Sequence, residues 1–308
     1  MSAEAAAGLE AIGGTPIVRL RRLVMPAMAE VWVKLEGGNP TGSYKDRMAL
    51  AMIEGAERAG RLRPGQTVVE YTGGSTGASL AFVCALKGYP LRIVTATAVA
   101  PEKIAVMRAF GAEAEILRDS DRLTADLLPR LMARAREIVD ETGGYATDQF
   151  RNADMVAGYR ALGRELATQL EGRLDALCLS VGTGGCLIGT SRALRESIPN
   201  ARRIAIEPTE SSVLSGGEPG THGIEGIGLG FWPPLLHRDD FDEVQTVSTA
   251  EAVEMARRAA RVEGIFSGPS TGANLLVALR LAAQLGPTRR IATVQVDSGL
   301  KYLSAAVF

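Results

Sequence analysis

The sequence predicts an α/β fold with parallel sheets, because short apolar runs typical of strands alternate with longer helical patterns along its 308 residues. The strand-like runs cover 31–35, 68–71, 91–95, 176–181, 203–206 and 291–296. No internal repeat or low-complexity tract interrupts this alternation. A chain of this length, 46% hydrophobic and 22% charged, is expected to bury a large core and to form two lobes.

A lysine opens the first helical pattern. The run 31–35 is followed by a polar loop that contains Pro40 and Gly42, and apolar residues then recur at helical spacing from Met48 to Ile53. This pattern places Lys45 at the start of a helix. Taken alone, the position is more typical of a solvated lysine than of a reactive one.

Two glycine-rich loops follow later strand-like runs. The loop 72–77, Thr-Gly-Gly-Ser-Thr-Gly, comes directly after the run 68–71, and the loop 182–186, Gly-Thr-Gly-Gly-Cys, directly after the run 176–181. A helical pattern follows each loop. A helix start offers unpaired backbone N–H groups, and glycines let a phosphate or carboxylate approach them. The sequence therefore offers two anion sites, although structural turns rich in glycine would look the same.

Motifs of other enzyme classes do not fit these loops. A dinucleotide fingerprint G-x-G-x-x-G starting at Gly182 would need a third glycine where Leu187 stands. A Walker loop starting at Gly37 would need lysine after Gly42, where the chain continues with serine and tyrosine. The G-x-S-x-G turn of serine hydrolases is absent around the glycine-rich loops.

Further motifs follow one another in order along nearly the whole chain. They are Ile12-Gly-Gly-Thr-Pro16, Lys34-Leu-Glu36, Asn39 to Arg47, the two glycine-rich loops, Glu207-Pro208 with Ser212 to Gly217, Ile224 to Phe231, Ser270-Thr-Gly-Ala273 and Asp297 to Leu303. In this order they resemble the cysteine synthases among the pyridoxal phosphate (PLP) enzymes of fold type II. Sulfhydrylases, cystathionine synthases and related eliminases share these motifs, so the resemblance is more specific for the family than for the reaction.

The resemblance implies a two-lobed PLP fold-type II architecture, in which each lobe is a mostly parallel twisted sheet flanked by helices. A smaller lobe of residues 41–145 would carry the loop that meets the substrate carboxylate. A larger lobe of residues 1–40 plus 146–308 would anchor the phosphate and the ring of the cofactor. The resemblance also implies a homodimer.

The same resemblance assigns roles to residues. Lys45 would hold PLP as a Schiff base, remove the proton from Cα and return it to the product. Ser270 would face the pyridine nitrogen and leave it neutral, which favours loss of a β leaving group; a helix cap is its alternative role. The expected cofactor-binding residues are Lys45, Ser75, Gly182, Thr183, Gly184, Gly185, Cys186 and Ser270. The expected substrate-binding residues are Thr72, Gly73, Ser75, Thr76 and Gln149, the last reaching from the other lobe.

The implied reaction is β-replacement on a small amino acid, most simply cysteine synthesis from O-acetylserine and sulfide. Ser75 stands where the family has an asparagine whose amide reaches both cofactor and substrate, and a serine hydroxyl is shorter, with no second donor arm. Cys186 stands where the family usually has threonine. The altered loop keeps β-elimination open as the alternative, either by a cysteine desulfhydrase that releases sulfide, pyruvate and ammonia or by a related ammonia-lyase. A slow family member acting as a binding or regulatory protein is a lesser alternative, against which the retained lysine and phosphate loop argue.

Charge and cysteine content argue against other partners. A net charge of −1 gives no reason to expect nucleic acid or an acidic membrane surface. Three separated cysteines and two histidines form no disulfide framework and no metal-binding spacing. The first seven residues lack the features of a signal peptide, and no apolar run is long enough to span a bilayer, so we expect a cytoplasmic protein. The tail of a serine acetyltransferase is a further partner implied by the resemblance.

Overall fold

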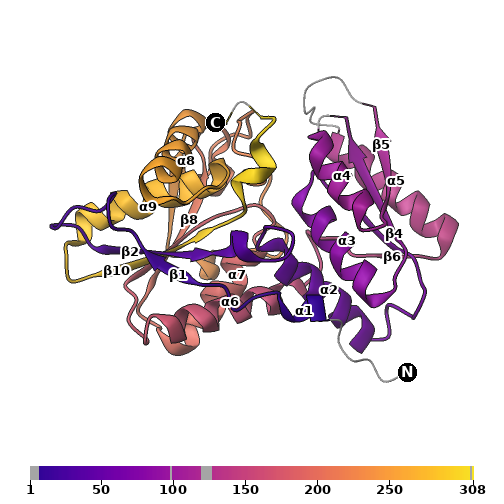
Figure 1. Cartoon of the computed structure of the whole chain (residues 1–308), viewed down its shortest axis with the longest axis horizontal. Helices are drawn as coiled ribbons and strands as arrows, with labels where there is room; N and C mark the ends of the chain where they lie inside the picture. The colour runs from indigo at the N-terminus through magenta and orange to yellow at the C-terminus, as the bar shows by residue number, and fades with distance from the viewer. Residues whose placement is uncertain (1–6, 98, 119–126, 306) are drawn as a thin grey trace. The chain divides into compact units, whose positions relative to one another are not determined.

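The computed structural model describes residues 7–97, 99–118, 127–305 and 307–308. Residues 1–6, on which the expected cytoplasmic location partly rests, lie outside them. The chain divides into two compact units (Figure 1). One comprises the described residues of Met1–Ile12 and Lys45–Met155, and the other those of Gly13–Tyr44 and Val156–Phe308. The carboxylate-binding and cofactor-anchoring roles expected of the two lobes stay predictions.

The first unit is built on a parallel four-stranded sheet with the order β5-β4-β3-β6 (Figure 1). All four residues of β3 are buried, and this strand is paired on both sides. The strands are β3 (Val68–Tyr71), β4 (Leu91–Ala96), β5 (Glu113–Leu117) and β6 (Tyr145–Ala146), and the helices are α1 (Ala7–Glu10), α2 (Lys45–Arg58), α3 (Ser75–Lys87), α4 (Pro101–Ala109) and α5 (Leu127–Thr142).

The second unit is built on a six-stranded sheet with the order β1-β2-β10-β7-β8-β9, parallel except for the antiparallel pair β1–β2. Its strands are β1 (Ile17–Arg19), β2 (Glu30–Leu35), β7 (Ala176–Ser180), β8 (Arg202–Pro208), β9 (Glu243–Val247) and β10 (Arg290–Gln295). Its helices are α6, which starts at the unit boundary (Met155–Gln169), α7 (Gly185–Ser197), α8 (Thr249–Glu263) and α9 (Pro269–Leu285). Short 3₁₀ helices cover Glu36–Gly38, Thr209–Ser211, Val213–Ser215, Arg238–Asp240 and Gly299–Tyr302.

A continuous apolar core fixes the helices of the second unit onto its sheet. It joins side chains such as Val31, Ile204 and Ile291 from the strands to Met255 of α8 and to Leu275 of α9. Most residues of α9 are buried, and each large apolar side chain removed from water stabilises the packed helix by roughly 1.5–3 kcal/mol. The start of α9 is therefore held at the ends of strands β7 and β10.

The predicted α/β class with mostly parallel sheets is confirmed, and each of the six predicted strands is present. The sequence did not predict β1, β5, β6 and β9. The strands β5 and β9 lie at sheet edges and are mostly only partly buried, so they lack a continuous apolar run. The strands β1 and β6 have only three and two residues, too few for a recognisable pattern.

Candidate functional site

The loop 72–77 connects the buried strand β3 to helix α3. Gly74, the N-cap of α3, has a φ of 150°, and a Cβ there would lie 2.7 Å from the Lys103 side chain. A Cβ at Gly77 would lie 2.7 Å from the Met107 side chain. The N-cap Gly74 has no side chain to cap α3, and its N–H donates to the Thr72 hydroxyl oxygen at 3.1 Å. The loop therefore presents a glycine-lined helix start, the arrangement that binds a carboxylate or phosphate in other proteins.

Gln149 is fixed against this loop by two side-chain hydrogen bonds. The Thr76 hydroxyl donates to Gln149 Oε1 at 2.7 Å, and Gln149 Nε2 donates to the Tyr71 carbonyl at 3.1 Å. The resemblance led us to expect Gln149 from the other lobe, whereas the structure groups it with the loop in one compact unit. The reason is the pairing of β6 with β3, which brings the segment after β6 to the end of β3. Two expected substrate-binding residues, Thr76 and Gln149, are thus in direct contact.

A buried carboxyl, Glu70, lies behind this arrangement. It is only 1% exposed and accepts hydrogen bonds from Tyr71 N (2.9 Å), the Thr147 hydroxyl (2.7 Å) and Gln149 N (3.1 Å). Burial raises the pKa of Glu70 to about 7; the nearby charge of Asp148 also raises it, and the three hydrogen bonds oppose the rise. The sequence analysis missed Glu70 and Thr147. One signal was present, a single acid within the apolar run 68–71.

Lys45 is the first residue of α2, as the sequence pattern predicts. Its side chain is 9% exposed, so the alternative of a solvated lysine is wrong. The helix packs against α3, the helix that begins in the loop 72–77. Lys45 thus shares a unit with the loop 72–77 and Gln149.

The loop 182–186 lies in the second unit, between β7 and α7. A Cβ at Gly182 would lie only 2.2 Å from the Gly226 carbonyl oxygen, so no other residue fits there without backbone movement. Gly184 caps α7 with a φ of 86°, in the left-handed region that favours glycine. Thr183 and Cys186 are buried, and the Cys186 sulfur lies 4.0 Å from the Thr190 hydroxyl oxygen. The loop is therefore a buried helix start without a side-chain cap, which fits a phosphate group.

Ser270 lies in the second unit with this loop. It is the second residue of α9, whose N-cap is Gly268, so Ser270 does not act as the helix cap. Asn274, one turn further on, accepts a hydrogen bond from Ser180 N at 2.7 Å and donates to the Val294 carbonyl at 2.9 Å. It joins the start of α9 to the ends of β7 and β10. The sequence analysis missed this role of Asn274, for which a polar residue inside an apolar helix is the available signal.

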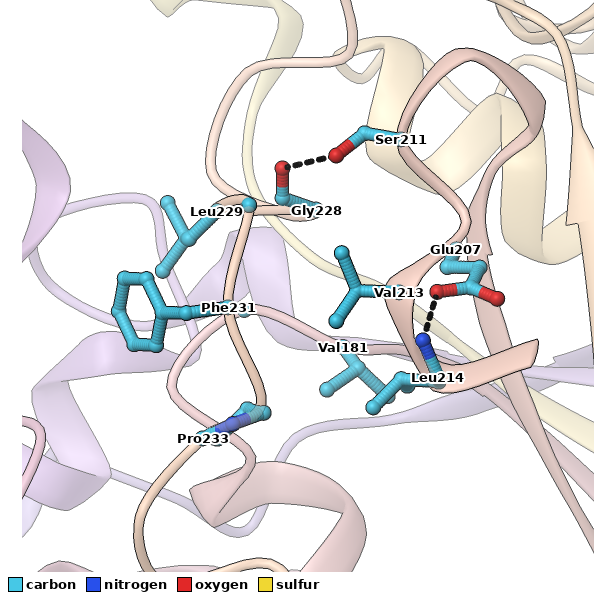
Figure 2. Close-up of a pocket in the computed structure, with 11 residues that line it drawn as sticks. Val181, Glu207, Ser211, Val213, Leu214, Gly228, Leu229, Phe231 and Pro233 are labelled. Atoms are coloured by element: carbon cyan, nitrogen blue, oxygen red, sulfur yellow. Dashed lines mark hydrogen bonds between the residues drawn. The ribbon is translucent and has the colours of Figure 1, made fainter. Parts of the chain in front are cut away.

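A small cavity adjoins Gly182 in the second unit (Figure 2). Its lining comes from the two residues after β7, from Glu207 of β8, and from residues 211, 213–214, 228–231 and 233. Glu207 at its wall accepts hydrogen bonds from Leu214 N (2.7 Å), Ser215 N (2.8 Å) and the Ser215 hydroxyl (2.6 Å), so its carboxylate is satisfied. The volume of about 10 Å³ matches one water molecule rather than a substrate.

Two features of other protein classes are absent from the described part of the chain. Its residues contain no group of three or more histidine, cysteine, aspartate or glutamate side chains that could hold a metal ion. None of the helices in the same ranges is long and apolar enough to cross a membrane.

The sequence of this chain matches a known protein family along most of its length. The profile of the family described as "Pyridoxal-phosphate dependent enzyme" matches residues 9–297. This chain belongs to that family of PLP-dependent enzymes. Bound PLP is accordingly its cofactor, and the buried glycine cradle at Gly182 to Cys186 fits the cofactor phosphate.

Individual relatives are similar over almost the full length. Cysteine synthases of Staphylococcus aureus, for example of strain N315, are 42% identical over 299 residues, which cover 96% of this chain and 95% of the relative. The crystal structure of an O-ureido-L-serine synthase matches with a TM-score of 0.92 and 34% identity, covering 98% of this chain and 94% of that one. A cysteine synthase structure from Entamoeba histolytica matches with a TM-score of 0.91 and 33% identity, covering 98% and 90%. The fold is therefore that of the PLP fold-type II enzymes.

Proposed function

We propose that this protein is a cysteine synthase, which makes cysteine and acetate from O-acetylserine and sulfide. The observation that carries the proposal is the glycine-lined helix start at 72–77, with the buried Gln149 bonded to the buried Thr76, in a chain similar to cysteine synthases along its length. Such a loop suits the carboxylate of a small amino acid. These relatives are cysteine synthases, so they do not favour the β-elimination alternative. Because they are enzymes, they also argue against the lesser alternative of a binding or regulatory protein.

The cofactor supplies an electron sink for negative charge at the substrate Cα. In our proposal Lys45 holds the cofactor through its side-chain amine, takes the proton from Cα and returns it to the product. Acetate leaves Cβ with the electron pair of the C–O bond, and the sulfide sulfur forms the new bond to Cβ. Cα keeps the same number of hydrogens at the end of the reaction as at the start.

The remaining site residues have supporting roles in this proposal. Residues 182–186 hold the cofactor phosphate by backbone N–H groups and the Thr183 hydroxyl, and Ser270 faces the ring nitrogen. Thr72, Gly73 and Ser75 hold the substrate carboxylate, together with the bonded pair Thr76 and Gln149. Ser75 also contacts the cofactor from the position of the family asparagine. What supports these assignments is the residue type at each position and the burial of residues 182–186 and of Thr72, Gly74, Thr76 and Gly77.

Finer statements about partners and location belong to the same proposal. The substrate is a small amino acid, the protein works as a homodimer in the cytoplasm, and the tail of a serine acetyltransferase binds it. These four statements rest on the resemblance of the sequence and on its composition. Light scattering of the purified protein, with and without an acetyltransferase tail peptide, tests the dimer and the tail.

The turnover test uses purified protein with O-acetylserine and sulfide. Cysteine formed together with an equal amount of acetate would support the proposal. Pyruvate and ammonia in place of cysteine would instead identify an eliminase.

A further inference from the structure

Glu70 is a buried carboxyl that the proposed reaction does not use. It lies in β3, with strands paired on both sides, and its two oxygens together accept three hydrogen bonds. One donor, Tyr71 N, immediately precedes the loop 72–77, and another, Gln149 N, belongs to the residue that contacts Thr76 in the loop. Glu70 therefore joins the two segments that build the expected carboxylate site.

Asp148 is the charged group that acts most directly on Glu70, and charges of both signs lie further out. Asp148 is its charged neighbour and accepts a hydrogen bond from the Tyr71 hydroxyl at 3.2 Å. The phenols of Tyr71 and Tyr145 also face this region. Arg151, 57% exposed at its side chain, lies 3.7 Å from Asp148, and Arg61, 47% exposed, lies 3.5 Å from the Tyr145 hydroxyl and pairs with Asp154, so neither guanidinium pairs with Glu70. The Lys103 side chain lies against the loop at Gly74. A substrate carboxylate in the loop would add a further anion, and like charges in a poorly solvated region disfavour each other.

Thr147 gives Glu70 a partner in both protonation states. Its hydroxyl lies 2.7 Å from Glu70 Oε2 and also 3.3 Å from the Val69 carbonyl oxygen. When Glu70 is ionised, the hydroxyl donates to the carboxylate. When Glu70 is protonated, the carboxyl O–H donates to Thr147 Oγ1 and the hydroxyl proton turns to Val69 O. The buried network therefore accepts one proton without leaving the hydroxyl unpaired.

We propose that Glu70 is a positioning residue that takes up one proton from solvent when the substrate carboxylate binds to the loop 72–77. Its hydrogen bonds to Tyr71 and Gln149 hold the loop and the glutamine in the geometry that receives the carboxylate. Protonation removes a buried negative charge next to the incoming anion. The proton returns to solvent when the product carboxylate leaves. The inference rests on the proposed function, in that the ligand of this loop is an amino acid.

The test uses L-alanine, which has a carboxylate but no β leaving group. Its dissociation constant with the holoenzyme is followed by the visible absorbance of the bound cofactor at several pH values. For the unmodified protein, affinity should fall more steeply above neutral pH than for Glu70→Gln, by up to about tenfold for each pH unit. The amide of Glu70→Gln is permanently neutral and can donate to Thr147, so it represents the protonated state.

Two further variants sharpen the comparison. Asp148→Asn keeps a residue type that tolerates the φ of 44° at this position but removes a charge that raises the pKa of Glu70. The pH above which the affinity for alanine begins to fall should therefore be lower in this variant. It also serves as the test if Glu70→Gln does not fold. Glu113→Gln removes an exposed acid of β5 in the same unit and should leave the pH dependence of the unmodified protein unchanged.

Proton uptake gives an independent readout. Calorimetry of alanine binding in two buffers with different ionisation enthalpies should show more protons taken up by the unmodified protein than by Glu70→Gln near neutral pH. Equal uptake together with equal pH dependence of affinity in these two proteins would overturn the proposal. Absence of cysteine formation from O-acetylserine would instead count against the proposed function, because alanine binding needs no turnover.

Discussion

At the scale of single residues, Lys45 combines a helix start with a buried side chain. Replacing it by alanine should remove the amine that holds the cofactor and moves the Cα proton. We expect Lys45→Ala to lower the rate of cysteine formation by at least roughly 10²- to 10⁴-fold and to abolish the visible absorbance of covalently held cofactor. Steady-state kinetics and an absorption spectrum check this.

Lys87→Ala is the matched control for Lys45→Ala. Lys87 lies in the same unit and pairs with Glu57 at 2.8 Å, away from the loop 72–77. Its removal should leave both the rate and the spectrum unchanged. A Lys45→Ala protein with a normal spectrum and normal turnover would show that the lysine is wrongly assigned.

Ser75 stands where the resemblance of the sequence led us to expect an asparagine. Ser75→Asn restores a longer amide with both a donor and an acceptor at the first helical position of α3. We expect it to raise the ratio of cysteine to pyruvate formed from O-acetylserine, because better contacts hold the reacting group for sulfide. Product analysis measures this ratio, with Ser75→Ala as the control that should not raise it. An unchanged ratio in Ser75→Asn would remove Ser75 from the account of reaction choice.

Residue types with special chemistry or backbone freedom could be predicted from the sequence. The glycines at 72–77 and 182–186 were recognisable from spacing, whereas Lys45 was singled out by the family resemblance, since its position alone is more typical of a solvated lysine. Glu70 and Asn274 were not recognisable, because their importance depends on partners far away in the sequence. Glu70 bonds to residue 149, and Asn274 bonds to residues 180 and 294. A single sequence contains no record of which strand lies beside which.

At the scale of elements, the glycine-rich connection from β7 to α7 depends on close backbone contact. Gly182→Ala would place a methyl group 2.2 Å from the Gly226 carbonyl oxygen, so the loop must move. We expect this variant to bind PLP at least about tenfold more weakly, because the backbone N–H groups lose their alignment. Equilibrium dialysis of the apoprotein against the cofactor measures the change.

Gly38→Ala is the control for Gly182→Ala, since a Cβ at Gly38 meets no atom within 4 Å and the residue is exposed in the same unit. It should bind the cofactor normally. Equal cofactor affinity in the two variants would contradict a tight phosphate loop at Gly182.

The elements themselves were predictable where burial imposes a strong pattern. Runs such as 68–71 and 176–181 were recognisable as strands because they are mostly apolar, and their strands are buried and paired on both sides. The edge strands β5 and β9 are mostly only partly buried. Their apolar residues are separated by charged or polar ones, so the hydrophobic pattern is too weak to predict a strand. The short β6 is defined by its pairing with β3 alone, yet it determines where Gln149 lies.

At the scale of the whole molecule, the buried Glu70 makes stability depend on pH. Its pKa is raised from 4.5 to about 7 in the folded state, so its ionised form is destabilised there. The contribution to stability is therefore fully present below about pH 4.5 and is lost as pH rises through about 7. Between about pH 5.5 and about pH 8 the loss amounts to about 2 kcal/mol.

Urea unfolding of the unmodified protein and of Glu70→Gln at these two pH values checks this prediction. The unmodified protein should lose about 2 kcal/mol more than the variant on going to the higher pH, because the amide does not titrate. An identical pH dependence of the free energy of unfolding in the two proteins would mean that Glu70 does not titrate in this range.

The central claim is that the protein replaces the β substituent of O-acetylserine with sulfide. The most direct test measures how O-acetylserine partitions between cysteine and pyruvate as the sulfide concentration is raised, with purified holoenzyme and both products assayed in the same samples. We predict that cysteine becomes the dominant product and that pyruvate falls as sulfide rises. Pyruvate that stays dominant at every sulfide concentration, together with rapid release of sulfide from added cysteine, would contradict the claim and identify an eliminase.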